Sequence, residues 1–222
     1  MAYTQRIFTE AQCDGIYDLS QKVGSTEDSA KRFIFMSQAN KEDEDQIAQA
    51  TNFYNGFYDL VQNNDVYTNS VVPSNTSLPS VYTSTIKFGE AWGWHRDDFT
   101  QKEVEMTREW TVIVSLNGPE DYEGGEVVVL DGGTESILKM PKGYAAICPA
   151  SNYVKFNKVT KGKRICMRWA VESLIKDREE FELNLRYNQL YNAFRENLSE
   201  QADELFVLAN NKLLNHLIKK NS

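Results

Sequence analysis

The sequence predicts an α+β protein, in which a β-sandwich or jelly roll of short strands is flanked by helices at both ends of the chain. Between about residues 80 and 173, short runs rich in β-branched and aromatic residues follow one another, separated by glycine-containing turns. Before and after this segment, apolar residues recur every three or four positions, the period of an amphipathic helix. The chain is therefore expected to have three parts: N-terminal helices over 1–75, a core over 76–175 and C-terminal helices over 176–222.

Length and composition exclude several classes of protein. The 222 residues suit one domain with appendages or two small domains, and a hydrophobic content of 41% is enough for a core. No apolar run approaches the roughly 20 residues that span a bilayer, and the N-terminus carries no secretory signal, so no membrane is expected. A net charge of −8 argues against nucleic-acid binding. Three cysteines without a CxxC spacing indicate thiols in a reducing compartment, either the cytoplasm or a particle assembled inside a cell.

Two helices and a loop are predicted before the core. Thr9 can cap a helix that runs from Glu10 to about Lys22. A second helix is predicted over about 42–61, and its apolar side carries Ala48, Phe53, Phe57 and Leu60. Asn, Ser, Thr and Pro then crowd residues 63–80, which predicts a loop there.

Seven β-rich runs make up the predicted core. They cover residues 81–88, 109–116, 125–130, 135–140, 144–149, 153–156 and 164–171. Turns such as "NGPEDYEGG", "LDGGT" and "MPKG" separate them, which favours short antiparallel strands in a sandwich or a jelly roll.

The tail is predicted to be helical from about residue 177. A first apolar stripe comprises Leu183, Tyr187, Leu190, Phe194 and Leu198. A second helix starting near Ser199 has a stripe of Ala202, Leu205, Phe206, Ala209, Leu213 and Leu217. Such stripes pack onto the sheet or onto a second subunit, so a homo-oligomer or a subunit of an assembly is expected through these helices. His216, beside the second stripe, is expected to be a helix-surface residue rather than a ligand.

The charge distribution along the core is uneven. Residues 136–171 contain no Asp, Glu or His but eight basic residues: Lys139, Lys142, Lys155, Lys158, Lys161, Lys163, Arg164 and Arg168. Two explanations remain open: solvated strand faces and turns, or a positive field that attracts an anionic cosubstrate.

The stretch "GWHRDDF" contains His95 and Asp97, which are two residues apart. In an extended chain, side chains at this spacing point the same way and can hold two positions on a divalent metal. A non-haem iron site usually takes a third ligand, most often a second His, and the only other His is His216. Trp92 and Trp94, beside the pair, are either walls of a pocket or core aromatics.

A basic residue, Arg164, lies in a later strand-like run after a "KG" turn. Its guanidinium can form a bidentate pair with a carboxylate. A metal pair, then strands, then an arginine is the order that an iron site with a dicarboxylate cosubstrate requires.

At these residues the sequence resembles the iron(II)- and 2-oxoglutarate-dependent dioxygenases, specifically the PKHD-type hydroxylases related to prolyl 4-hydroxylases. The resemblance covers about residues 80–195 and is carried by "GEAWGWHRDD", "SLNGPEDYEGGEVVV", "CPASNYVKFNKVTKGKR" and "MRWAVESLIKDRE". It implies a double-stranded β-helix (jelly roll) core. It also implies iron(II), 2-oxoglutarate and ascorbate as cofactors and, by analogy, a peptide or protein side chain as substrate.

The resemblance assigns His95 and Asp97 as catalytic iron ligands and Arg164 as the residue that grips the distal carboxylate of 2-oxoglutarate. Counted back from the "VTKG" turn, the family's second His falls on Val154, which has no donor atom. The neighbours of this position are poor iron(II) ligands or lie too far along the chain: Asn152, Tyr153, Lys155 and Cys148.

Three hypotheses follow. The first is a hydroxylase that works with an incomplete metal triad and converts 2-oxoglutarate to succinate. The second is a structural or binding subunit on the same fold, whose chemistry has lapsed. The third is a site for another metal or for an anion near Arg164.

Overall fold

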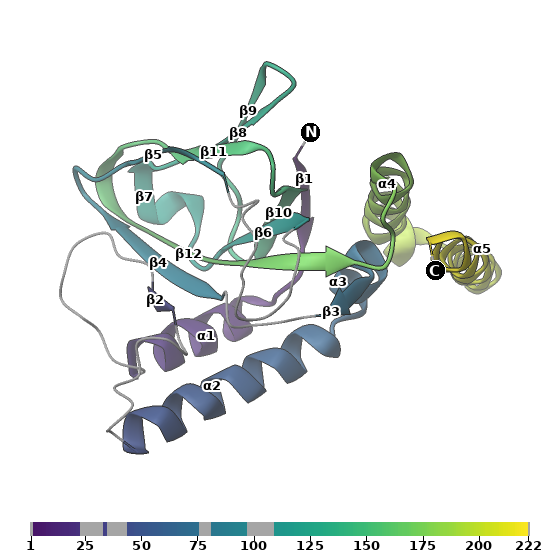
Figure 1. Ribbon diagram of the computed structural model, residues 1–222, viewed down its shortest axis with the longest axis horizontal. Helices are drawn as coiled ribbons and strands as arrows, with labels where there is room; N and C mark the ends of the chain where they lie inside the picture. The colour runs from purple at the N-terminus through teal and green to yellow at the C-terminus, as the bar shows by residue number, and fades with distance from the viewer. Residues whose placement is uncertain (1, 23–32, 35–43, 76–80, 97–108, 222) are drawn as a thin grey trace.

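The computed structural model describes residues 2–22, 33–34, 44–75, 81–96 and 109–221 (Figure 1). The helices are α1 (Glu10–Lys22), α2 (Glu44–Gln62), α3 (Asp65–Val71), α4 (Arg178–Phe194) and α5 (Glu200–Asn221). The strands are β1 (Tyr3–Arg6), β2 (Phe33–Ile34), β3 (Pro73–Asn75), β4 (Tyr82–Lys87), β5 (Trp92–His95), β6 (Trp110–Ser115), β7 (Tyr122–Gly124), β8 (Val127–Asp131), β9 (Thr134–Leu138), β10 (Tyr144–Pro149), β11 (Tyr153–Phe156) and β12 (Val159–Ser173). Within these ranges, no helix has the length and hydropathy that crossing a membrane requires.

The strands form two antiparallel sheets that curl toward each other (Figure 1). An eight-stranded sheet follows the order β1-β10-β6-β12-β4-β2, with β3 and β7 also paired to β12. A four-stranded sheet follows the order β5-β11-β8-β9. Buried residues from both sheets share one interior core, among them Ile113, Val129 and Phe156. This arrangement confirms the predicted α+β class with a jelly-roll core flanked by helices.

The long strand β12 separates two cores by the alternation of its side chains. Ile165, Met167 and Trp169 belong to the core beneath the helices, whereas Cys166 belongs to the jelly-roll interior. Because side chains two residues apart share a face, Arg164 and Arg168 face the interior with Cys166. β12 therefore carries two arginines into the space between the sheets.

The N-terminal helices cover the outer face of the eight-stranded sheet. Thr9 starts α1 as predicted: its Oγ1 accepts from the Gln12 N–H at 3.2 Å, and the Gln12 side chain accepts from the Thr9 N–H at 2.8 Å. From α2, Phe57 meets the Trp169 ring edge-on at a centroid distance of 5.4 Å. Ala48 is exposed, which corrects its assignment to the apolar side of α2.

The predicted loop over 63–80 is wrong over residues 65–75, which contain α3 and then β3. The Asn64 side chain accepts a hydrogen bond from the Tyr67 N–H at 2.8 Å and caps α3. The Tyr67 hydroxyl in turn accepts from the Trp169 indole N–H at 3.1 Å. Polar residues that usually mark turns here serve as a helix cap, and a buried aromatic pair holds the helix in place. Residues 76–80 lie outside the described ranges.

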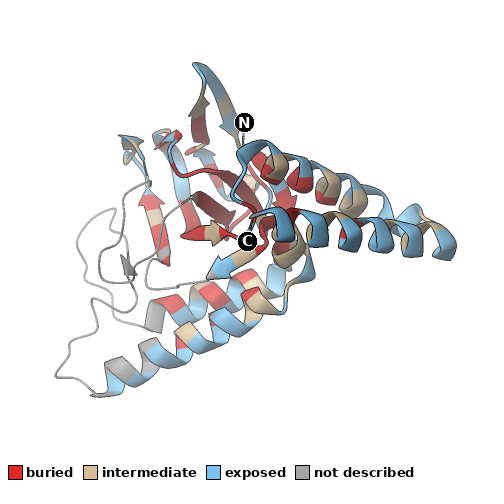
Figure 2. Ribbon diagram, turned by 45° about the vertical axis from the view of Figure 1, so that its right-hand side comes forward, coloured by how far each residue is buried: buried red, intermediate tan, exposed pale blue. Residues whose placement is uncertain are grey.

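Helix α4 buries a different face from the predicted one, whereas α5 buries Leu217 of its predicted stripe, with Leu213 packed against the same core. α4 buries Phe181, Asn184, Leu185 and Asn188. The Asn184 side-chain amide donates to the carbonyls of Asn69 and Ser70 at 2.9 and 3.0 Å, so a polar face turns inward. The predicted residues Leu183, Leu190 and Phe194 are 56–58% exposed, and Leu205 on α5 is 66% exposed. Packing of these four residues onto the sheet is therefore excluded, and Figure 2 shows the two helices projecting from the body with much of their surface exposed.

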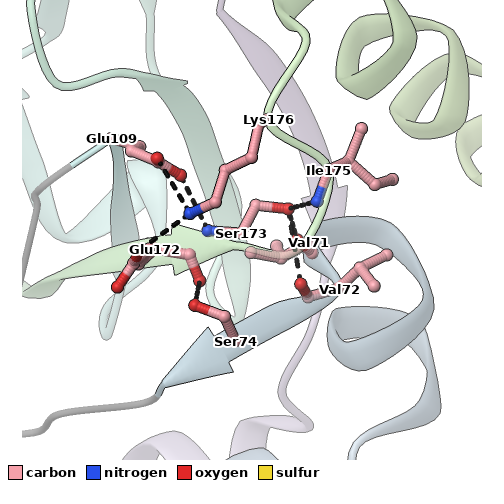
Figure 3. A network of polar contacts seen from close by, with 8 residues as sticks. All are labelled: Val71, Val72, Ser74, Glu109, Glu172, Ser173, Ile175 and Lys176. Carbon is pink, nitrogen blue, oxygen red and sulfur yellow. Dashed lines mark hydrogen bonds and ion pairs between the residues drawn. The ribbon is translucent and has the colours of Figure 1, made fainter. Parts of the chain in front are cut away.

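A polar network fastens the end of β12 to α3 (Figure 3). The buried Ser173 hydroxyl donates to the Val71 carbonyl at 2.7 Å, and the Ser173 N–H donates to Glu109 at 3.0 Å. Lys176 pairs with Glu109 and Glu172 at 3.1 and 2.7 Å. These bonds fix the exit of β12 and so help to hold the register of its arginines.

Candidate active site

His95 ends β5 with its imidazole oriented by hydrogen bonds on both nitrogens. Its Nδ1 lies 2.8 Å from the Gly93 carbonyl oxygen, and its Nε2 lies 2.8 Å from Nη1 of Arg168. A carbonyl only accepts and a guanidinium only donates, so Nδ1 carries the proton and Nε2 offers its lone pair. The predicted partner Asp97 lies outside the described residues, and the His95–Asp97 pair stays a prediction.

Val154 lies directly opposite His95. The two Cα atoms are partners in the pairing of β11 with β5, and Val154 is 2% exposed within the jelly-roll interior. Residues opposite each other in antiparallel strands have Cβ atoms about 4.5–5.5 Å apart, so an imidazole at 154 would approach the same point as His95. The isopropyl group of valine offers no ligand there. The assignment of Val154 to the family's second His stays a prediction.

Arg164 is buried inside the jelly roll on β12, where it is 1% exposed. It lies opposite Ile86 in the pairing of β12 with β4. Its guanidinium carbon lies 4.6 Å from the ring centroid of Phe156. Its Nε and Nη1 are buried and lack a hydrogen-bond partner within the described part of the chain. Leaving a buried polar group unpaired costs about 1–3 kcal/mol, and more for a charged one. A carboxylate oxygen would accept a charge-assisted hydrogen bond from either of these nitrogens.

Arg168 lies four residues further along the same face of β12 and is 2% exposed. Its guanidinium carbon lies 5.3 Å from the ring centroid of Trp92, which meets Phe156 at 5.1 Å. His95 stacks on Phe156 at 6.4 Å. Both arginines and the imidazole therefore gather on one aromatic pair. In the sequence, Arg168 stands out only as one of eight basic residues, although its spacing from Arg164 places both on one strand face.

The basic residues of this segment divide between the interior and the surface. Arg164 and Arg168 are interior, whereas the lysines are exposed or half-buried. Lys142 and Lys161 pair with Asp14 and Glu123 at 2.5 and 3.0 Å. Surface pairs of this kind contribute little to stability.

The remaining predicted candidates divide between the interior and the surface. Cys148 is buried in the interior core, whereas Tyr153 and Trp94 are 45% and 41% exposed. Trp92, packed against Phe156, is therefore the tryptophan of this pair that lines the interior. His216 is exposed on α5, as predicted.

The described residues fit a carboxylate better than they fit iron(II). Among them, no group of three or more His, Cys, Asp or Glu side chains is placed to hold a metal ion. The Nε2 of His95, the atom that would bind iron, accepts a hydrogen bond from Arg168, and a valine faces it across the strands. Arg164, by contrast, presents two unpaired donors to the same interior.

Comparison with known proteins gives relatives of one kind. No protein-family model matches the chain. A PKHD-type hydroxylase of Psychrobacter sp. (strain PRwf-1) is 29% identical over 129 residues, which are 56% of this chain and 49% of the relative. A PKHD-type hydroxylase of Phenylobacterium zucineum (strain HLK1) is 28% identical over 149 residues, 64% of this chain and 65% of the relative. The chain thus spans about half the length of the first of these relatives and about two thirds of the second.

Solved structures of prolyl hydroxylases also align with the chain at low identity. The viral collagen prolyl hydroxylase of Paramecium Bursaria Chlorella virus-1 aligns with a TM-score of 0.49 at 16% identity, over 78% of this chain and 95% of that one. A Pseudomonas putida prolyl-4-hydroxylase aligns with a TM-score of 0.48 at 11% identity, over 77% and 92% of the two chains. The sequence relatives show that this chain is similar to PKHD-type hydroxylases, as its four motifs predict.

Proposed function

We propose that this protein binds 2-oxoglutarate inside its jelly roll, with Arg164 gripping one carboxylate, and that hydroxylase chemistry has lapsed. The observation that carries the proposal is a guanidinium that is 1% exposed and has two buried nitrogens without a partner among the described residues. An arginine and a carboxylate form charge-assisted hydrogen bonds, and a carboxylate here would give one of these nitrogens its missing acceptor. Kinship with PKHD-type hydroxylases supports 2-oxoglutarate as the ligand.

The proposed loss of turnover rests on the surroundings of His95. Iron(II) in this family would supply oxygen activation, and His95 and Asp97 would be its ligands. Val154 faces His95 without a donor atom, and Arg168 bonds to the Nε2 lone pair. Loss of an outer-shell partner alone weakens metal binding by about 10- to 100-fold, and loss of an inner ligand should cost more.

A second candidate function is hydroxylation of a peptide or protein side chain with iron(II), 2-oxoglutarate and ascorbate. The His95 Nδ1–H bond to the Gly93 carbonyl favours it, because metal-binding histidines are commonly oriented in this way.

Partners are proposed from the C-terminal helices. Exposed apolar side chains line α4 and α5, including Leu190, Phe194, Leu205 and Leu208. We propose that these helices mediate a homo-oligomer or docking into a larger assembly, which native mass spectrometry of the wild type would detect. A net charge of −8 does not favour nucleic acid. The three cysteines are buried and form no disulfide within the described residues, which suits a reducing cytoplasm.

Calorimetric titration with 2-oxoglutarate tests the binding proposal. Arg164→Met should weaken binding by about 100-fold, because truncating one partner of a buried charge pair costs 2–5 kcal/mol. Arg186→Met, at an exposed arginine on α4, is the matched control and should bind as the wild type does. Unchanged affinity in Arg164→Met contradicts the proposal.

A succinate assay with iron(II) and ascorbate separates the two candidate functions. The lapsed-chemistry proposal expects no succinate from the wild type. Succinate from the wild type, lost in His95→Ala, would establish the hydroxylase instead. Succinate that appears only in Val154→His would support lapse through this one position.

A further inference from the structure

We propose that Arg168 takes the place of a metal ion in this site, so that two arginines bind a dicarboxylate without metal. The inference rests on the proposed function of Arg164 and adds a second carboxylate-binding group. It changes the ligand class from 2-oxoglutarate alone to four- and five-carbon dicarboxylates.

The geometry places the two guanidinium groups in one compartment. Arg164 and Arg168 project from the same face of β12, and their guanidinium carbons lie 4.6 and 5.3 Å from the centroids of Phe156 and Trp92. Those two rings are 5.1 Å apart, packed edge to face across β11 and β5. An elongated anion along this aromatic wall would meet Arg164 at one end and Arg168 at the other.

The guanidinium of Arg168 lies beside His95 Nε2, where a metal ion bound to this imidazole would lie. Its Nη1 lies 2.8 Å from Nε2, the lone pair through which this imidazole would bind a cation. A guanidinium stays protonated in a protein, so the charge at this point is permanent. A divalent cation at Nε2 would have to displace Arg168 and would then lie beside its positive charge. The second carboxylate of a dianion is instead attracted to this point, because the guanidinium groups of Arg164 and Arg168 are both positively charged.

The rest of the interior supports a polar, elongated ligand. The hydroxyls of Tyr122 and Ser84 are buried and lack a hydrogen-bond partner within the described residues. Tyr122 belongs to the interior core, and Ser84 is the partner of Cys166 in the pairing of β4 with β12. Both hydroxyls add polar groups to this interior. Without a metal to chelate, the 2-oxo group is not needed for binding.

The test is calorimetry with excess EDTA, using 2-oxoglutarate, glutarate and the monocarboxylate pentanoate as probes. The wild type should bind both dicarboxylates with affinities within about tenfold of each other. Arg168→Met should weaken both dicarboxylates by about 30-fold or more and leave pentanoate unchanged, whereas Arg164→Met should weaken all three. Methionine is a suitable replacement, because apolar residues of similar volume often substitute for buried charges without loss of stability.

Two further arms make the outcome decisive. Arg168→Lys keeps the charge without the planar fork and should show an intermediate loss, which provides the test if Arg168→Met does not fold. Dicarboxylate binding that appears only after anaerobic addition of iron(II) would overturn the inference and leave the role of Arg164 intact. Equal binding by wild type and Arg168→Met would also overturn it. Absence of dicarboxylate binding with and without iron(II) would instead reject the proposed function.

Discussion

Replacement of Val154 by histidine tests the interpretation of the metal half of the site. Val154 is 2% exposed and lies between His95 on β5 and Val129 on β8. The change removes a buried isopropyl group and inserts a larger ring, which typically costs about 1–3 kcal/mol, and the buried ring N–H costs about 1–3 kcal/mol if it finds no acceptor. We therefore expect Val154→His without metal to lose about 2–6 kcal/mol of unfolding free energy if the ring N–H finds no acceptor.

With metal, the sign of the effect should reverse. A second imidazole opposite His95 would supply a ligand that the wild type lacks, and we expect iron(II) to bind at least about 100-fold more tightly. This gain corresponds to about 2.7 kcal/mol and should recover a large part of the lost stability. The positive charge of Arg168 opposes iron(II) binding. The double variant Val154→His/Arg168→Met should therefore gain more binding free energy for iron(II) than the two single variants gain in sum.

The assay is anaerobic iron(II) titration followed by thermal unfolding with and without the metal. Lys155→His is the matched control, because residue 155 lies on the same strand but its side chain points to the opposite sheet face. If Val154→His binds iron no better than Lys155→His, the assignment of residue 154 to the missing ligand position is refuted.

Two further predictions concern the scaffold. Ser173→Ala should lower the unfolding free energy by about 1–3 kcal/mol in urea titrations, because it removes the buried hydroxyl that links β12 to α3. Ser151→Ala, at an exposed serine in a turn, is its control, and equal losses in the two variants would count against the network. Burial raises the pKa of the Cys13 thiol from 9.0 to about 11. The folded state therefore holds this proton more tightly, so stability should fall as pH rises from about 9 to about 11. Alkylation of Cys13 at pH 8 should be at least about 100-fold slower in folded than in urea-unfolded protein, and equal rates would contradict the burial.

Local patterns predicted most of the core strands. The runs at 144–149 and 153–156 coincide with β10 and β11, because β-branched and aromatic residues between glycine turns specify short strands directly. The helix α3 was missed because its cap, Asn64, is a residue type that also marks turns, and because the contact that stabilises it joins Tyr67 to the distant Trp169. The edge strand β1 was missed for a similar reason, since its pairing with β10 joins segments far apart in the chain.

The site was predictable in part. Counting from a turn indicated Val154, and only strand pairing places it opposite His95. A role for Arg168 in the site was not predicted, because it depends on contacts with His95 and Trp92, which belong to the other sheet. The apolar stripe on α4 predicted a buried face wrongly, because a buried asparagine such as Asn184, bonded to backbone carbonyls, does not contribute to a hydrophobic period.

The central claim is that this interior recognises an anion independently of a metal. Anaerobic iron(II) titration of the wild type, with and without saturating 2-oxoglutarate, tests it most directly, because coupling between two ligands is reciprocal. We expect weak iron binding that 2-oxoglutarate changes by no more than about threefold. An increase of about 100-fold in iron affinity on addition of 2-oxoglutarate would contradict the account, since it would mean that both ligands share one coordination sphere.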